Sequence, residues 1–112
     1  DNRVSDKMLL EAKKYLTKFK MKKLIKLLKK DNNQNYSLNG MLSGGEKQRL
    51  SIIRTILMGG EVLFFDEPTS SLDIVNEKIV MREIQKLKKD KIIIISTHKK
   101  DLKKFFDKVI YL

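Results

Sequence analysis

Apolar side chains recur at helical spacing over the first thirty residues. Between residues 5 and 19 they return every three or four positions, at Leu9, Ala12, Leu16 and Phe19. Residues 22–29 alternate pairs of apolar residues with lysines. Both patterns predict amphipathic helices, the first of them capped by Ser5 or Asp6. The Asn-rich run over residues 31–40 predicts a loop.

Short apolar runs and helical patterns alternate in the second part of the chain. Runs without polar alternation occupy residues 62–65, 92–95 and 109–112, which predicts three strands. Helical spacing predicts a helix at about residues 76–88 and a shorter one around Leu102. Without a tight hairpin signal, these elements predict an α/β fold with right-handed parallel crossovers. Continuous Ile runs also predict that both faces of the sheet are covered.

The stretch Leu42–Arg49, which reads LSGGEKQR, combines a helix start with two glycines. The spacing Ser43-x-x-Glu46 fits a capping box, the role that we favour for Glu46. Helical spacing continues to residue 57, and Gly59-Gly60 can end the helix in a left-handed cap. The first amides of such a helix have no helical partner and lie at the positive end of its dipole. They can therefore bind a phosphate group.

Acidic residues follow the first predicted strand directly. Residues 62–65 run into Asp66, Glu67 and Pro68. Carboxylates at the carboxyl edge of a parallel sheet commonly hold Mg²⁺ and act in catalysis. The only histidine, His98, follows the second predicted strand and would lie at the same edge. Taken alone, these residues also fit a plain strand-ending turn and a surface histidine.

Four motifs in order resemble those of the ABC ATPases. LSGGEKQR is similar to the signature, VLFFDEP to Walker B, SSLD to the D-loop and STH to the H-loop. The resemblance implies a helical subdomain remnant over residues 1–41. It also implies the β-α-β-α-β second half of a RecA-like P-loop NTPase core, with parallel strands, over residues 42–112. Neither a GxxxxGK[ST] phosphate loop (Walker A) nor a glutamine-loop (Q-loop) candidate precedes the signature, so we expect a fragment or one half of a split ATPase.

The resemblance implies catalytic roles at the predicted sheet edge. Asp66 resembles the aspartate that holds Mg²⁺, usually through a water molecule. Glu67 resembles the general base that polarises the attacking water. His98 resembles the switch histidine that contacts the γ-phosphate of ATP. Lys99 stands where the family commonly has Asp, which makes the neighbouring contact differ from the family pattern.

The resemblance also implies a role at a second nucleotide. In ABC dimers the signature of one domain faces the ATP bound by its partner, so Ser43, Gly44 and Gly45 would contact the partner's ATP. Glu46 replaces the commoner Gln at the neighbouring position of that site. Asp73 resembles the D-loop aspartate of the dimer interface. The expected cofactors are therefore ATP and Mg²⁺.

As a whole, the resemblance implies an ATP hydrolase that drives transport across a membrane. The implied partners are a second nucleotide-binding domain, a transmembrane transporter subunit or domain, and the missing Walker A half. The location would be the cytoplasm, at the inner face of a membrane. Two alternatives stay open. One is an SMC-type DNA-tethering ATPase, which would show heptads before the signature. The other is a ribosome-associated ABC protein, which typically has Asn-His where this chain has Ser70-Ser71.

Without a phosphate loop and its lysine, we expect the isolated chain to be inactive. In the family, the strand that feeds that loop lies between the strands corresponding to residues 92–95 and 109–112. We therefore expect an exposed apolar edge and self-association of the isolated chain.

The net charge of +11 arises from 25 basic and 14 acidic residues. The lysines are scattered and lack interleaved aromatic residues, so we interpret them as a solvated surface and do not expect nucleic acid as a partner. A Lys-rich helix lying on a membrane is the alternative. The chain has no Cys, and its apolar runs are too short to span a bilayer.

Overall fold

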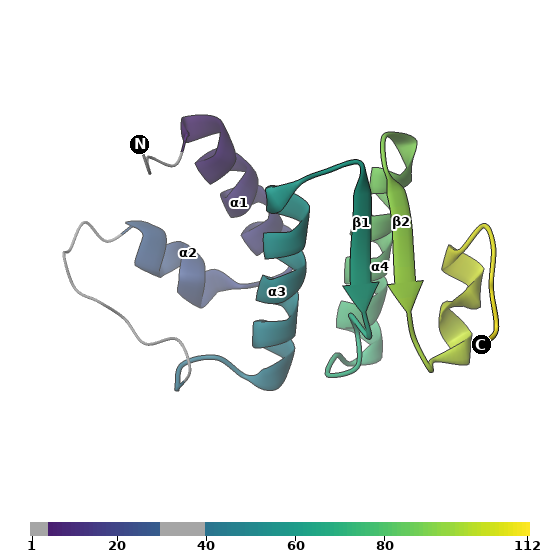
Figure 1. Cartoon of the computed structure of the whole chain (residues 1–112). Coiled ribbons are helices and arrows are strands. Elements are labelled where there is room, and N and C mark those ends of the chain that lie inside the picture. Colours follow the sequence, from purple (N-terminus) through teal and green to yellow (C-terminus); the bar gives the residue numbers. More distant parts are fainter. Residues whose placement is uncertain (1–4, 30–39) are drawn as a thin grey trace.

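The computed structural model describes residues 5–29 and 40–112 as a mixed α/β arrangement (Figure 1). In chain order the elements are α1 (Asp6–Lys18), α2 (Lys22–Lys29), α3 (Gly44–Met58), β1 (Val62–Asp66), α4 (Ile74–Lys86), the 3-10 helix η1 (Leu87–Lys89), β2 (Ile92–Ser96) and the 3-10 helix η2 (Lys100–Phe105). Most of the loop predicted at residues 31–40 lies outside the described residues. The predicted helices and the first two strands are confirmed within a few residues.

Local sequence signals set the ends of the helices. Ser5 caps α1, since its Oγ accepts a hydrogen bond from the Met8 amide at 3.1 Å. The helix α3 ends at Met58, and the next two residues, Gly59 and Gly60, have φ of 72° and 111°. Gly59 combines its positive φ with ψ of −158°, a region that glycine alone reaches readily. The chain can therefore turn sharply from α3 into β1.

A buried arginine joins the helices of the first part to α4. Arg49, in α3, is 8% exposed. Its Nη1 donates hydrogen bonds to the Phe19 carbonyl at 2.9 Å and to the Asn76 Oδ1 at 3.0 Å. Phe19 follows α1 and is fully buried. A single guanidinium thus connects the end of α1, the middle of α3 and the start of α4.

The two strands pair in parallel, with Val62 opposite Ile92 and Asp66 opposite Ser96. One face of this sheet is covered by α4, which lies behind the strands in Figure 1. Side chains from both layers form one buried cluster, which includes Leu63, Phe65, Val80, Met81 and Ile84. This layer fixes both strands, so their carboxyl ends lie side by side.

The expectation that both sheet faces are covered is wrong for the described residues. The other face exposes large apolar side chains: Val62 (52%), Phe64 (57%), Ile92 (63%) and Ile94 (46%). Continuous apolar runs predict two buried faces, but burial needs a second layer. In Figure 1 the described helices lie behind the two strands or beside the edges of the sheet, so this face has no second layer over it.

The third predicted strand is also not present. Residues 109–112 adopt no regular structure, and Val109, Ile110, Tyr111 and Leu112 are all exposed. A strand requires a neighbour to satisfy its backbone hydrogen bonds. In the sheet of the described residues, only β1 and β2 pair, so residues 109–112 have no such neighbour. The β-α-β-α-β order is therefore realised only as far as β1-α4-β2.

Residues 5–29 and 40–112 include no helix with the length and apolar character needed to cross a membrane.

Candidate active site at the carboxyl edge of the sheet

Acidic and polar side chains meet where the two strands end. Asp66 and Ser96 are partners in the strand register, and the Asp66 Oδ1 accepts a hydrogen bond from the Ser96 hydroxyl. The next residue, Glu67, donates its amide to the Ser96 carbonyl at 2.8 Å. Parallel pairing therefore brings Asp66 and Glu67 beside the segment that follows β2.

That segment carries His98, which contacts Glu67 twice. The His98 amide donates to the Glu67 Oε1 at 3.0 Å, and the His98 Nε2 lies 3.5 Å from the same oxygen. The imidazole is fully exposed, whereas the Glu67 side chain is 31% exposed. The carboxylate is thus held in place by a backbone amide, and the imidazole remains accessible to a ligand.

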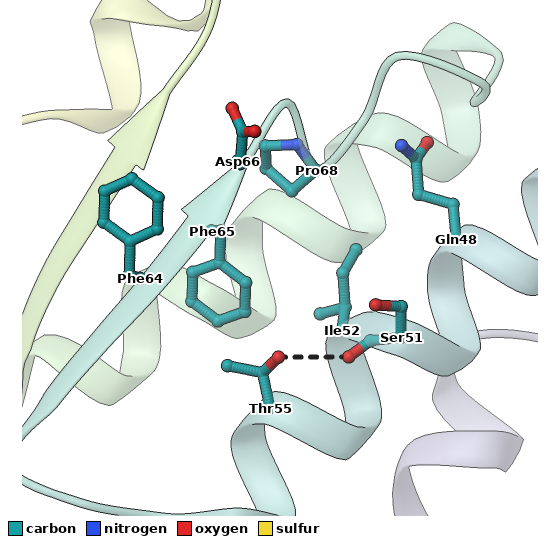
Figure 2. A pocket seen from close by; sticks show the side chains of 8 residues that line it. All are labelled: Gln48, Ser51, Ile52, Thr55, Phe64, Phe65, Asp66 and Pro68. Carbon is teal, nitrogen blue, oxygen red and sulfur yellow. Dashed lines mark hydrogen bonds between the residues drawn. The ribbon is translucent and has the colours of Figure 1, made fainter.

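An open hollow lies between α3 and β1, next to this edge. Its lining comes from both elements and the following turn: Gln48, Ser51, Ile52, Thr55, Phe64, Phe65, Asp66 and Pro68. Figure 2 shows Asp66 and Pro68 at the end of β1, with Gln48 on the facing helix. The helix α3, which begins with the signature-like stretch, and the turn over residues 66–71, here called the acidic turn, therefore border the same space.

The capping box predicted at the start of α3 is present. The Glu46 amide donates to the Ser43 Oγ, and the Ser43 amide donates to the Glu46 Oε1, both at 3.1 Å. The hydrogen bond from the Ser43 amide holds the pKa of Glu46 below its usual value. Glu46 therefore directs its carboxylate at the backbone of its own helix. The amides of Gly44 and Gly45 form no hydrogen bond to another described residue.

Asp73, which resembles a D-loop aspartate, caps the next helix. Asp73 precedes α4, and its carboxylate accepts from the Asn76 amide at 2.8 Å and from the Asn76 Nδ2 at 3.2 Å. The turn that ends at Asp73 also packs closely on the signature. A Cβ placed on Gly45 would lie 3.0 Å from the Ser71 carbonyl oxygen. The glycine thus permits a close approach of α3 to this turn.

Comparison with known proteins identifies the family. The sequence profile of the ABC transporter family matches residues 2–70. The chain belongs to the ABC transporter family. The matched segment includes the LSGGEKQR and VLFFDEP stretches, and it ends before Asp73 and His98.

Several ABC proteins resemble this chain over about seventy residues. A probable ABC transporter ATP-binding/permease protein of Haemophilus influenzae is 40% identical over 73 residues, which are 65% of this chain and 13% of the relative. The macrolide export ATP-binding/permease protein MacB of Campylobacter fetus is 46% identical over 70 residues, 62% of this chain and 11% of the relative. The lactococcin-G-processing and transport ATP-binding protein LagD of Lactococcus lactis is 46% identical over 71 residues, which are 63% of this chain and 10% of the relative. The chain thus spans about a tenth of the length of these relatives.

The donor set at the edge fits Mg²⁺ bound together with a nucleotide. Among the described residues, no group of three or more acidic, His or Cys side chains could hold a metal ion alone. Mg²⁺ commonly takes only one or two protein carboxylates and completes its shell with water and substrate phosphates. Asp66 is exposed at the end of β1 and can supply such a carboxylate.

The sequence singled out Lys99 only as a departure from the family pattern, whereas in the structure this lysine connects three parts of the candidate site. The Lys99 Nζ donates to the Thr69 carbonyl at 2.7 Å and to the Glu77 Oε2 at 2.6 Å. Thr69 belongs to the turn after Glu67, and Glu77 to the first turn of α4. The departure from the family's Asp at this position was visible in the sequence. The partner of Lys99 on α4, Glu77, could not be predicted in this way, because their contact depends on how α4 packs.

Proposed function

We propose that this chain is part of the ATP-hydrolysing domain of an ABC transporter. The observation that carries the proposal is the convergence of Asp66, Glu67 and His98 at one sheet edge. Relatives named as ATP-binding/permease, export and transport proteins favour a transporter over the DNA-tethering and ribosome-associated alternatives. In this proposal β1-α4-β2 is half of a RecA-like core over residues 42–112, preceded by a helical subdomain remnant over residues 1–41.

At the edge of the sheet, each residue has a distinct role in the proposed reaction. Glu67 takes a proton from the attacking water, and the His98 amide keeps its carboxylate at the edge. The His98 imidazole contacts the γ-phosphate from the solvent side. Asp66 holds Mg²⁺, which when bound offsets the negative charge of the phosphates.

The start of α3 serves the nucleotide of a second domain in this proposal. The amides of Gly44 and Gly45, at the positive end of the helix, donate to the phosphates, together with the Ser43 side chain. Glu46 contributes by capping rather than by direct contact. Asp73 lies at the dimer interface. The dimer would sit at the cytoplasmic face of the membrane, bound to a transmembrane partner.

The test of this proposal compares the isolated chain with the complete ATP-binding domain that contains it. Because a phosphate loop supplies much of the binding energy for a triphosphate, we expect the isolated chain to bind MgATP weakly or not at all. We expect the complete domain to bind and hydrolyse it. Calorimetry and phosphate release measure the two properties. An inactive complete domain, or micromolar affinity in the isolated chain, would contradict the proposal.

A further inference from the structure

Gln48 uses its whole side-chain amide on the turn after β1. Its Nε2 donates to the Glu67 carbonyl and to the Ser70 Oγ, both at 2.9 Å. Its Oε1 accepts from the Ser71 amide at 2.8 Å. Gln48 lies in the second turn of α3, half-buried beside the hollow shown in Figure 2. One side chain thus links the signature helix to three residues of the acidic turn.

The backbone of Glu67 needs such support. Its φ is 47°, in the left-handed region that side chains other than glycine rarely adopt. It also precedes Pro68, and a residue before proline favours an extended conformation. A residue in this state persists only where its surroundings hold it. Glu67 has its amide bonded to the Ser96 carbonyl at 2.8 Å, so β2 fixes one side of the peptide.

The carbonyl group of Glu67 depends on Gln48. The Glu67 carbonyl accepts two hydrogen bonds, from the Gln48 Nε2 at 2.9 Å and from the Ser70 amide at 3.4 Å. The longer of these lies beyond the usual range for an N–H donor, so Gln48 supplies the stronger one.

We propose that Gln48 is a positioning residue for Glu67 in the ATPase site, an inference that rests on the function proposed above. By holding the Glu67 carbonyl, it keeps the carboxylate at the sheet edge beside His98. It also fixes the distance between this turn and the second turn of α3. A displacement of α3 would therefore move Glu67 as well.

The variant Gln48→Glu separates positioning from simple packing. It keeps the size of the side chain and an oxygen to accept from the Ser71 amide. The second oxygen now faces the Glu67 carbonyl, and when ionised it repels that carbonyl. When protonated it can donate a hydrogen bond there, as the amide does. The defect should therefore shrink as the pH falls.

The experiment measures ATP hydrolysis by the complete ATP-binding domain between about pH 5 and pH 8.5, so that its acidic end approaches the ordinary pKa of a Glu side chain. For Gln48→Glu at the alkaline end, we expect kcat to fall at least about tenfold while KM for ATP stays within about threefold. We also expect the ratio of variant to wild-type kcat to rise toward low pH. The matched control is Gln85→Glu in α4, which should retain wild-type kcat and a pH-independent ratio.

A wild-type kcat in Gln48→Glu, or a reduced kcat with a ratio that does not change with pH, overturns the inference. In either case, ATP hydrolysis by the wild-type domain would still support the proposed function. An inactive wild-type domain instead overturns both the inference and the proposed function.

If Gln48→Glu does not fold, Gln48→Met replaces it. This variant has similar length and no amide, and it should lower kcat to a similar extent with KM unchanged. Wild-type kcat in Gln48→Met overturns the inference.

Discussion

Single side chains hold the acidic turn to its surroundings, and Lys99, which bonds the Thr69 carbonyl of this turn and the Glu77 carboxylate of α4, is the clearest example. The Glu77 side chain is only 13% exposed. Burial alone would raise its pKa, but the hydrogen bond from Lys99 and the nearby positive charges outweigh burial. The pKa of Glu77 is therefore lowered in the folded state. Such a group stabilises the fold above its unfolded pKa, and this stability is lost as pH falls through the folded pKa.

Replacing Lys99 by Met should lower the free energy of unfolding at pH 7 by roughly 1–2 kcal/mol, because Glu77 loses its charged partner. Without Lys99, burial raises the pKa of Glu77, so the variant's carboxyl takes up a proton at a higher pH than the wild-type carboxyl does. The difference from wild type should therefore shrink as the pH falls through the acid range, and it should vanish once Glu77 is neutral in both proteins. Chemical denaturation of the complete domain at several pH values measures both effects. Lys100→Met, at an exposed neighbour, is the control. A loss that is the same at every pH would rule out this ion pair as its cause.

Asp66, Glu67 and His98 could be predicted at one edge because each comes within three residues of the end of an apolar run, 62–65 or 92–95. It did not reveal the partners of Gln48, Arg49 and Lys99. Each of these reaches a residue more than fifteen positions away in the chain, and the contact exists only after the helices have packed. Local patterns predict where a residue lies in its element, but not which distant carbonyl it bonds.

At the level of whole elements, the start of α3 packs closely on the turn before α4. Gly45→Ala would place a Cβ 3.0 Å from the Ser71 carbonyl and 3.4 Å from the Leu72 Cδ2. Because backbone atoms cannot move aside easily, we expect the free energy of unfolding to fall by about 1–3 kcal/mol. Thermal or chemical unfolding of the complete domain measures this loss.

Gly44→Ala provides the matched control for this prediction. Its Cβ would meet only the Ser71 side chain, at 4.0 Å, which is ordinary contact. We expect stability within about 0.5 kcal/mol of wild type. Equal losses in the two variants would mean that the close approach of α3 is not what requires glycine.

Elements that depend on local signals were predicted well, and those that depend on neighbours were not. The helices follow from apolar spacing and from caps such as Ser5 and Ser43. The strand predicted at residues 109–112 has the right composition, but the described chain offers no strand to pair with it. In the same way, the sheet of β1 and β2 has only one covered face because the described chain offers no second layer for the other face.

For the molecule as a whole, the uncovered sheet face predicts association. Phe64, Ile92 and Ile94 are each exposed by 46% or more and lie on one side of two paired strands. Contiguous apolar surface of this kind tends to be buried against another molecule. We expect the isolated chain to self-associate in a concentration-dependent way in sedimentation experiments.

Ile94→Lys should weaken this association by at least about tenfold, since it places a charge at the centre of the face. Leu10→Lys is the control, because Leu10 is 70% exposed on α1, away from the sheet. A monodisperse monomer at high concentration, or equal effects of the two variants, would show that the face does not drive association.

In the proposed function, ATP is hydrolysed at the acidic edge of the sheet, with Glu67 as the base. The most direct measurement is the rate of ATP hydrolysis by the complete domain carrying Glu67→Gln, together with its affinity for ATP. The amide keeps the shape of the side chain but cannot accept the proton from water. We expect kcat to fall on the order of 10²–10⁴-fold while ATP affinity stays within a few-fold of wild type. An unchanged rate would contradict the account.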